Sequence, residues 1–105
     1  MLNFARAPTL FIVKKEVFEW ISTGQKTVEL GGGKAKHDDA VFQCGGNILR
    51  GNIFKRKEGS LTDVLRLDNY RNIIPSAQSL EEAITYLKRL YGTTEGVFTA
   101  CYFKV

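Results

Sequence analysis

The sequence predicts one α+β domain, a small, strongly curved sheet or barrel of about five strands with two or three helices against it. At 105 residues the chain has the usual size of a single domain, and 44% hydrophobic with 25% charged residues is typical of a packed globular protein. Apolar patterning gives the order β-α-β-β-β-α-α-β, which lacks the regular β-α-β alternation of a parallel doubly wound fold. We expect an N-terminal tail over residues 1–8 and the domain over residues 9–105.

The first elements follow from short apolar runs near the N-terminus. Residues 9–14 (TLFIVK) form an apolar, β-branched run that predicts a strand. A helix is expected over Lys14–Thr23, because apolar residues recur four positions apart and Gly24 supplies a C-terminal stop. Residues 26–30 (KTVEL) then alternate as a half-buried strand does.

The middle of the chain predicts two more strands. These are residues 40–44 (AVFQC) and 47–57 (NILRGNIFKRK), and the Gly45-Gly46 pair between them is a hairpin-type connection. Inside the second strand, Gly51 indicates a bulge or a bend at a barrel corner.

A short helix is expected next. Ser60 and Asp63 have the spacing of a capping box, which opens a helix that runs through Leu67. The polar segment 68–76 follows, and we expect it to cover one end of the barrel.

The strongest helical pattern covers Leu80–Tyr91. Ser79 is placed to cap this helix, Glu82 to close a capping box, and Gly92 to end it. The last strand is predicted in residues 96–105 (GVFTACYFKV), which are rich in aromatic and β-branched side chains.

The charge distribution favours an anionic partner. The formal net charge is +4 and the isoelectric point is near 9.2. Acidic residues concentrate around Glu81 and Glu82, whereas the basic residues form two separate clusters, which predicts one face suited to phosphate. These clusters are Lys34, Lys36 and His37, and Arg50, Lys55, Arg56 and Lys57.

Several classes of protein are disfavoured. Cys44 and Cys101 are too few and too far apart to be a disulfide framework, and with His37 as the one histidine and no CxxC motif we expect no metal site and no cofactor. The sequence contains no apolar run of membrane-spanning length and no secretory signal, so we expect a cytoplasmic protein without a membrane partner.

The segment Gly24–Gly31 (GQKTVELG) carries the most information about function. In an alternating strand, Lys26 and Glu29 leave opposite faces and need not pair with each other. A twisted strand at the rim of a barrel could still bring both side chains to one cleft.

This segment resembles the GxKxxExR motif of the ASCH domain, a family of small PUA-like β-barrels. Gly24, Lys26 and Glu29 match three of the four marked positions, and the order of elements over residues 9–105 agrees with the family. The fourth position departs from it, because Gly31 stands where the family carries an arginine that presents a planar fork to a phosphate or carboxylate.

The resemblance implies an RNA- or nucleotide-binding protein that recognises RNA or a modified nucleoside in a cleft beside the barrel. Lys26 and Glu29 would line that cleft, and their basic neighbours would follow the nucleic-acid backbone. The residues expected to bind nucleic acid are Lys26, Glu29, Lys34, Lys36, Arg50 and Lys55. Candidate platforms for base stacking, or else core residues, are Trp20, Tyr70, Tyr91 and Tyr102.

Two alternatives remain open at this stage. Some ASCH proteins resemble amidohydrolases that act on N4-acetylcytidine-type nucleosides with a lysine, a threonine and a glutamate. Lys26 matches that lysine, but Glu29 stands where that branch has its threonine, and Thr27 lies two residues away. Lys26 and Glu29 would then be the catalytic pair. The second alternative is a non-catalytic protein-interaction module.

The position of Lys26 also makes a prediction about stability. As an exposed lysine at the rim of the barrel, it should be dispensable for folding, so Lys26→Ala should abolish binding or turnover with little loss of stability.

Overall fold

The computed structural model describes residues 8–31 and 37–105 and confirms the α+β class. All five predicted strands are present, but the described helices number four, because one extra helical turn forms in the polar segment 68–76. The predicted tail, apart from Pro8, lies outside the described residues. In chain order the elements are β1 (Thr9–Ile12), α1 (Lys15–Ser22), β2 (Val28–Gly31), β3 (Asp39–Cys44), β4 (Asn47–Gly59), α2 (Leu61–Val64), α3 (Tyr70–Ile73), α4 (Leu80–Tyr91) and β5 (Phe98–Lys104).

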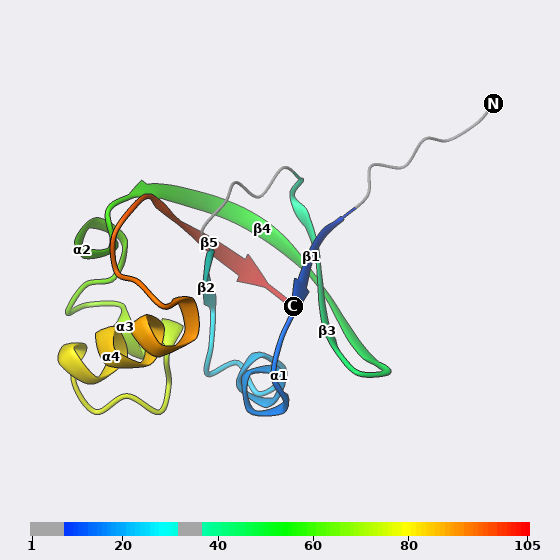
Figure 1. Ribbon diagram of the computed structural model, residues 1–105. Helices are drawn as coiled ribbons and strands as arrows, with labels where there is room; N and C mark the ends of the chain where they lie inside the picture. The colour runs from blue at the N-terminus through cyan, green and yellow to red at the C-terminus, as the bar shows by residue number, and fades with distance from the viewer. Residues whose placement is uncertain (1–7, 32–36) are drawn as a thin grey trace.

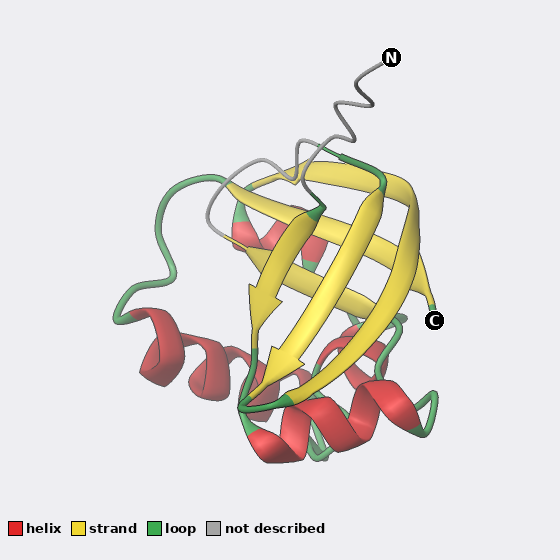
Figure 2. Cartoon of the chain, turned by 90° about the vertical axis from the view of Figure 1, so that its right-hand side faces the viewer, coloured by secondary structure: helices red, strands yellow, loops and turns green. Residues whose placement is uncertain are grey.

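The strands form one sheet in the order β1-β3-β4-β5-β2. Strands β1 and β3 are parallel, and the other neighbours are antiparallel. The sheet curls into a half-barrel with the helices gathered toward one end (Figure 2). Strands β1 and β2 are the two edges of the sheet, and helix α1 links them along the chain (Figure 1).

Two hydrophobic clusters stabilise the domain, one on each face of the sheet. The first joins β2 and β5 to helices α2, α3 and α4, and the second lies inside the curl and includes one residue of α1. None of the described helices is long and apolar enough to cross a membrane. The first cluster buries Val28, Leu30, Leu61, Val64, Leu65, Ile73, Ile74, Ala77, Ala83, Leu87, Phe98 and Ala100, and the second Ile21, Ala40, Phe42, Ile53, Cys101 and Phe103.

The predicted helix ends are largely as the sequence indicates. The Ser79 hydroxyl accepts a hydrogen bond from the backbone N–H of Glu82 at 3.1 Å, and Gly92 ends α4 in the left-handed conformation with φ of 78°. The capping box of α2 also forms, because the backbone N–H and hydroxyl of Ser60 both donate to the Asp63 carboxylate. Helix α2 nevertheless ends at Val64, short of the predicted Leu67.

The bulge in β4 lies elsewhere than expected. The pairing of β3 with β4 passes through Gly51 without a shift, and the register irregularity falls between Ile53 and Lys55. Gly51 is required for a different reason, since a Cβ atom there would lie 2.7 Å from the backbone oxygen of Lys104. The glycine therefore permits a close approach of two strands, and Phe54 is the bulged residue.

Candidate functional site

The turn between α1 and β2 is fixed by the elements on both sides of it. Gly24 adopts a positive φ of 79° directly after the helix. The backbone N–H of Lys26 then donates to the Trp20 carbonyl at 3.0 Å, and that of Thr27 donates to the Asn72 carbonyl at 3.0 Å. Because β2 begins only after this anchored turn, strand alternation does not extend back to Lys26. The expectation that Lys26 and Glu29 leave opposite faces of one strand is therefore wrong.

The two motif side chains form an ion pair. The Nζ atom of Lys26 lies 2.9 Å from Oε2 of Glu29 and also donates a hydrogen bond to the carbonyl of Ile73 at 2.5 Å. The Lys26 side chain is only 3% exposed and that of Glu29 is 15% exposed. The prediction of an exposed rim lysine is wrong, because α3 covers the turn and supplies a carbonyl to the ammonium group. An ammonium has three N–H donors, so one remains for a ligand.

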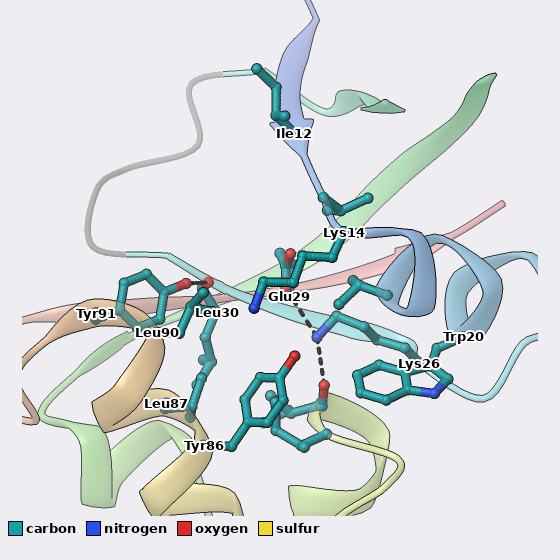
Figure 3. A pocket seen from close by; sticks show the side chains of 14 residues that line it. Ile12, Lys14, Trp20, Lys26, Glu29, Leu30, Tyr86, Leu87, Leu90 and Tyr91 are labelled. Carbon is teal, nitrogen blue, oxygen red and sulfur yellow. Dashed lines mark hydrogen bonds and ion pairs between the residues drawn. The ribbon is translucent and has the colours of Figure 1, made fainter. Parts of the chain in front are cut away.

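The ion pair lines a cavity of about 230 Å³ between the turn, α1, α3 and α4. Figure 3 shows Lys14 reaching across it from the chain before α1, with Glu29, Lys26 and Tyr86 directed toward the same space. The walls are otherwise mainly apolar and aromatic. The described lining residues are Ile12, Val13, Lys14, Val17, Trp20, Lys26, Glu29, Leu30, Ile73, Ile74, Tyr86, Leu87, Leu90 and Tyr91.

Two tyrosines of α4 bring phenol groups to the cavity. The hydroxyl of Tyr91 donates to the carbonyl of Leu30, on the edge strand β2, and the hydroxyl of Tyr86 lies 3.4 Å from a carboxylate oxygen of Glu16. Burial and then the charge of Glu29 raise the pKa of Tyr91 to about 12. Burial, followed by the charge of Glu16, also raises the pKa of Tyr86. Both phenols are therefore neutral at physiological pH.

Thr27, the alternative nucleophile of the hydrolase hypothesis, does not face this cavity. Its side chain is exposed and lines a separate depression together with Gly24 and Lys104. The fourteen described residues that line the cavity include no serine, threonine or cysteine. Within the described part of the chain, the cavity therefore lacks a hydroxyl or thiol of ordinary nucleophilic character.

The predicted nucleic-acid-binding residues do not form one group. Lys26 and Glu29 meet at the cavity, but Lys55 pairs across the sheet with Tyr102, whereas Glu29 pairs with Cys101. Neighbouring residues of a strand point to opposite faces, so Lys55 lies on the face opposite to Glu29. Arg50 also lies outside the cavity lining. The remaining two predicted residues, Lys34 and Lys36, lie outside the described residues.

Some contributors to the cavity escape prediction from the sequence. Of the four candidate aromatic platforms, Trp20 and Tyr91 line it, and Tyr86 lines it without having been predicted. The signal for Tyr86 is its position three residues after the buried Ala83 on α4, on the same helical face. Lys14 also lines the cavity, although nothing in its sequence neighbourhood indicates this.

Two solved structures share this fold. The crystal structure of the hypothetical protein PH0355 superposes with a TM-score of 0.74 at 17% sequence identity, covering 90% of this chain and 95% of that one. The solution NMR structure of protein PF0455 from Pyrococcus furiosus gives a TM-score of 0.67 at 20% identity, covering 91% and 94%. No family model and no curated protein matches the sequence. The likeness establishes the fold alone.

Proposed function

We propose that this chain binds RNA or a modified nucleoside, with a single base seated in the cavity beside Lys26 and Glu29. The observation that carries the proposal is a buried ion pair that lines an otherwise apolar and aromatic cavity. Removing two charges from water is costly, and a few polar groups in an apolar pocket are what fixes the orientation of a bound ligand. The pair therefore suits recognition better than it suits stability.

The size of the cavity suits one base. Its volume of about 230 Å³ is below the ~300–1,000 Å³ of pockets for drug-sized ligands. Trp20 and Tyr86 stand side by side in it, with ring centroids 6.3 Å apart and planes tilted by 49°. Aromatic rings of this kind provide the faces on which an unpaired base stacks.

The polar groups of the cavity match the edge of a base. Lys26 offers one N–H donor, and Glu29 offers carboxylate oxygens as acceptors beside it. Bases present donors and acceptors next to each other on their pairing edges, which proteins read when the base is unpaired. Lys14, which also lines the cavity, supplies a cation for a phosphate.

The resemblance to the ASCH family supports the same proposal. Gly31 occupies the position of the arginine in the family motif. It lies two residues after Glu29 on β2, so an arginine there would be on the same face of the sheet as Glu29. In this chain Lys14 approaches the cavity from the other edge of the sheet (Figure 3), so we propose that it takes over the cationic role. A lysine provides charge without the bidentate geometry of arginine, which favours looser phosphate contact.

Binding is favoured over amidohydrolysis. The two cavity hydroxyls belong to Tyr86 and Tyr91, whose raised pKa values make them poor nucleophiles at neutral pH. The Glu29 carboxylate is engaged by Lys26, which disfavours its use as a general base for water. One N–H of Lys26 and the remaining lone pairs of the Glu29 carboxylate stay available for hydrogen bonds to a ligand.

The proposal can be tested by fluorescence, because Trp20 is the single tryptophan of the chain and lines the cavity. The four ribonucleosides, their 5′-monophosphates, N4-acetylcytidine and a short RNA would be titrated separately. We expect a saturable change with at least one of them, weakened by Glu29→Gln and unchanged by the exposed control Glu81→Gln on α4. No saturable change with any ligand would refute the proposal, and acetate released from N4-acetylcytidine would favour the hydrolase.

A further inference from the structure

A second surface lies on the outer face of β4 and β5, on the side of the sheet opposite to Glu29. The strand register places Arg50 beside Val41, Asn52 beside Lys104, and Lys55 beside Tyr102, all on this face. Helices α2, α3 and α4 pack against Phe98 and Ala100 on this face of β5. Figure 2 shows that the helices gather toward one end of the curled sheet, and that the outer surface of the sheet away from them is uncovered. We call Arg50, Asn52, Phe54, Lys55, Lys57 and Lys104 the β4 surface.

An exposed aromatic ring lies in this surface. The register shift between Ile53 and Lys55 leaves Phe54 unpaired at a bulge, with 58% of its area exposed. The Lys104 ammonium lies 5.5 Å from the centroid of the Phe54 ring. The neighbouring Lys55 ammonium lies 4.9 Å from the ring of Tyr102. The fold thus keeps a phenylalanine in solvent with the ammonium of Lys104 beside its ring.

The charge of the surface has one dominant sign. The described parts of β3, β4 and β5 place four cations on this face but one carboxylate. That carboxylate is Asp39, which lies directly opposite Asn52. A phosphate backbone is the complementary polyanion. The four cations are Arg50, Lys55, Lys57 and Lys104.

We infer that the β4 surface binds single-stranded nucleic acid, with one base stacked on Phe54 and the backbone phosphates held by Lys55, Lys104 and Arg50. Proteins that bind single strands combine an exposed aromatic platform with cations that follow the backbone, and both features are present here. An acidic protein would also satisfy the cations, and the comparison of oligouridine with an abasic strand distinguishes it from a nucleic acid whose base stacks on the ring. The inference does not rest on the cavity, because the cavity lining contains none of the residues of the β4 surface.

The test uses fluorescence anisotropy with a labelled 12-nucleotide oligouridine and with an abasic strand of the same length. We expect Phe54→Ala to lower the affinity for oligouridine about tenfold. Phe54→Trp should preserve it, and Leu67→Ala, at an apolar residue elsewhere that is even more exposed, should leave it unchanged. The wild type should bind the abasic strand about tenfold more weakly than oligouridine. The wild type and Phe54→Ala should bind the abasic strand with the same affinity.

The cations make an independent prediction. Replacing both Lys55 and Lys104 by glutamine should reduce the slope of log affinity against log salt by about 1.4, since each phosphate contact to a single strand contributes about 0.7. The double variant Lys88→Gln/Arg89→Gln, at two exposed cations of α4, serves as the charge-matched control and should keep the salt slope of the wild type.

The outcomes separate this inference from the proposed function. Equal binding of oligouridine and the abasic strand, or an unchanged affinity of Phe54→Ala for oligouridine, would overturn the stacking role. An unchanged salt slope in the double variant would overturn the phosphate contacts. The Trp20 response to mononucleosides should be the same in wild type and Phe54→Ala, so that failure at one site is visible without reference to the other.

Discussion

The ammonium of Lys26 lies 2.9 Å from the carboxylate of Glu29, three residues along the chain. It also donates a hydrogen bond at 2.5 Å to the carbonyl of Ile73, 47 residues away. This contact ties the turn before β2 to the end of α3. It makes Lys26 a structural residue as well as a candidate ligand-binding one, so the two roles have to be separated by experiment.

Lys26→Ala should destabilise the protein substantially. The substitution leaves Glu29 and the Ile73 carbonyl without their partner in a largely buried setting, and we expect the free energy of unfolding to fall by about 2–4 kcal/mol. Urea denaturation monitored by circular dichroism measures this. The exposed Lys15→Ala should change the free energy of unfolding by less than about 0.5 kcal/mol. A stable Lys26→Ala variant would restore the expectation of a dispensable rim lysine.

The pairing of Lys26 with Glu29 should appear as coupling in a double-mutant cycle. Lys26→Met and Glu29→Gln each leave the other member without its charge partner, whereas the double variant removes both charges. We expect the summed single effects to exceed the effect of the double variant by about 1–3 kcal/mol, because residues in direct contact are not additive. Additive effects would mean that the pair contributes no interaction energy in solution.

The raised pKa of Tyr91 predicts that the stability of the protein depends on pH in the alkaline range. Its pKa of about 12 in the folded protein exceeds the ordinary value of 10.0, so the folded state retains the phenol proton that the unfolded state loses. The corresponding stability is fully present below pH 10 and is lost as the pH rises through 12. Tyrosinate absorbance should therefore show late-titrating groups, because the pKa of Tyr86 is raised as well, and Tyr91→Phe should remove the group with a pKa of about 12. If the titration curve of Tyr91→Phe still contains the group with a pKa of about 12, the assignment to Tyr91 is incorrect.

Gly51 should tolerate no side chain. A methyl group there meets the Lys104 carbonyl at 2.7 Å, so Gly51→Ala must move β4 away from β5 and should cost about 1–3 kcal/mol. Gly46 is a matched control, because a Cβ atom there meets nothing within 4 Å and its φ is not positive. Thermal unfolding of the two alanine variants compares them, and equal midpoints would contradict the close-approach argument.

Local signals in the sequence predict much of the fold. The cap at Ser79 and the glycine at position 92 bound α4, and the Gly45-Gly46 pair forms the turn of the β3–β4 hairpin. Each of these depends on residues only a few positions apart, where backbone preferences and side-chain caps act directly. The position of the bulge in β4 is set instead by pairing with β5, and Gly51 misdirects the prediction because its reason is a contact across the sheet.

The candidate site is only half predictable for the same reason. The motif identifies Lys26 and Glu29, but the burial of Lys26 depends on α3, and the cavity walls depend on how α4 packs. Tyr86 and Lys14 come from elements far apart in the chain, so their meeting at the cavity is a property of tertiary packing alone. Arg50 and Lys55, close in sequence to other basic residues, lie instead on the outer face of the sheet.

The proposed function requires that a base occupies the cavity of Lys26 and Glu29. The most direct measurement is a series of ¹H–¹⁵N correlation spectra during titration with the nucleoside that gives the strongest Trp20 response. A base bound in the cavity should cause saturable shifts of the Trp20 indole N–H and of the Glu29 and Leu30 amides, and these shifts should be smaller in Glu29→Gln. Shifts confined to the β4 surface, or unaltered by Glu29→Gln in a folded protein, would contradict it.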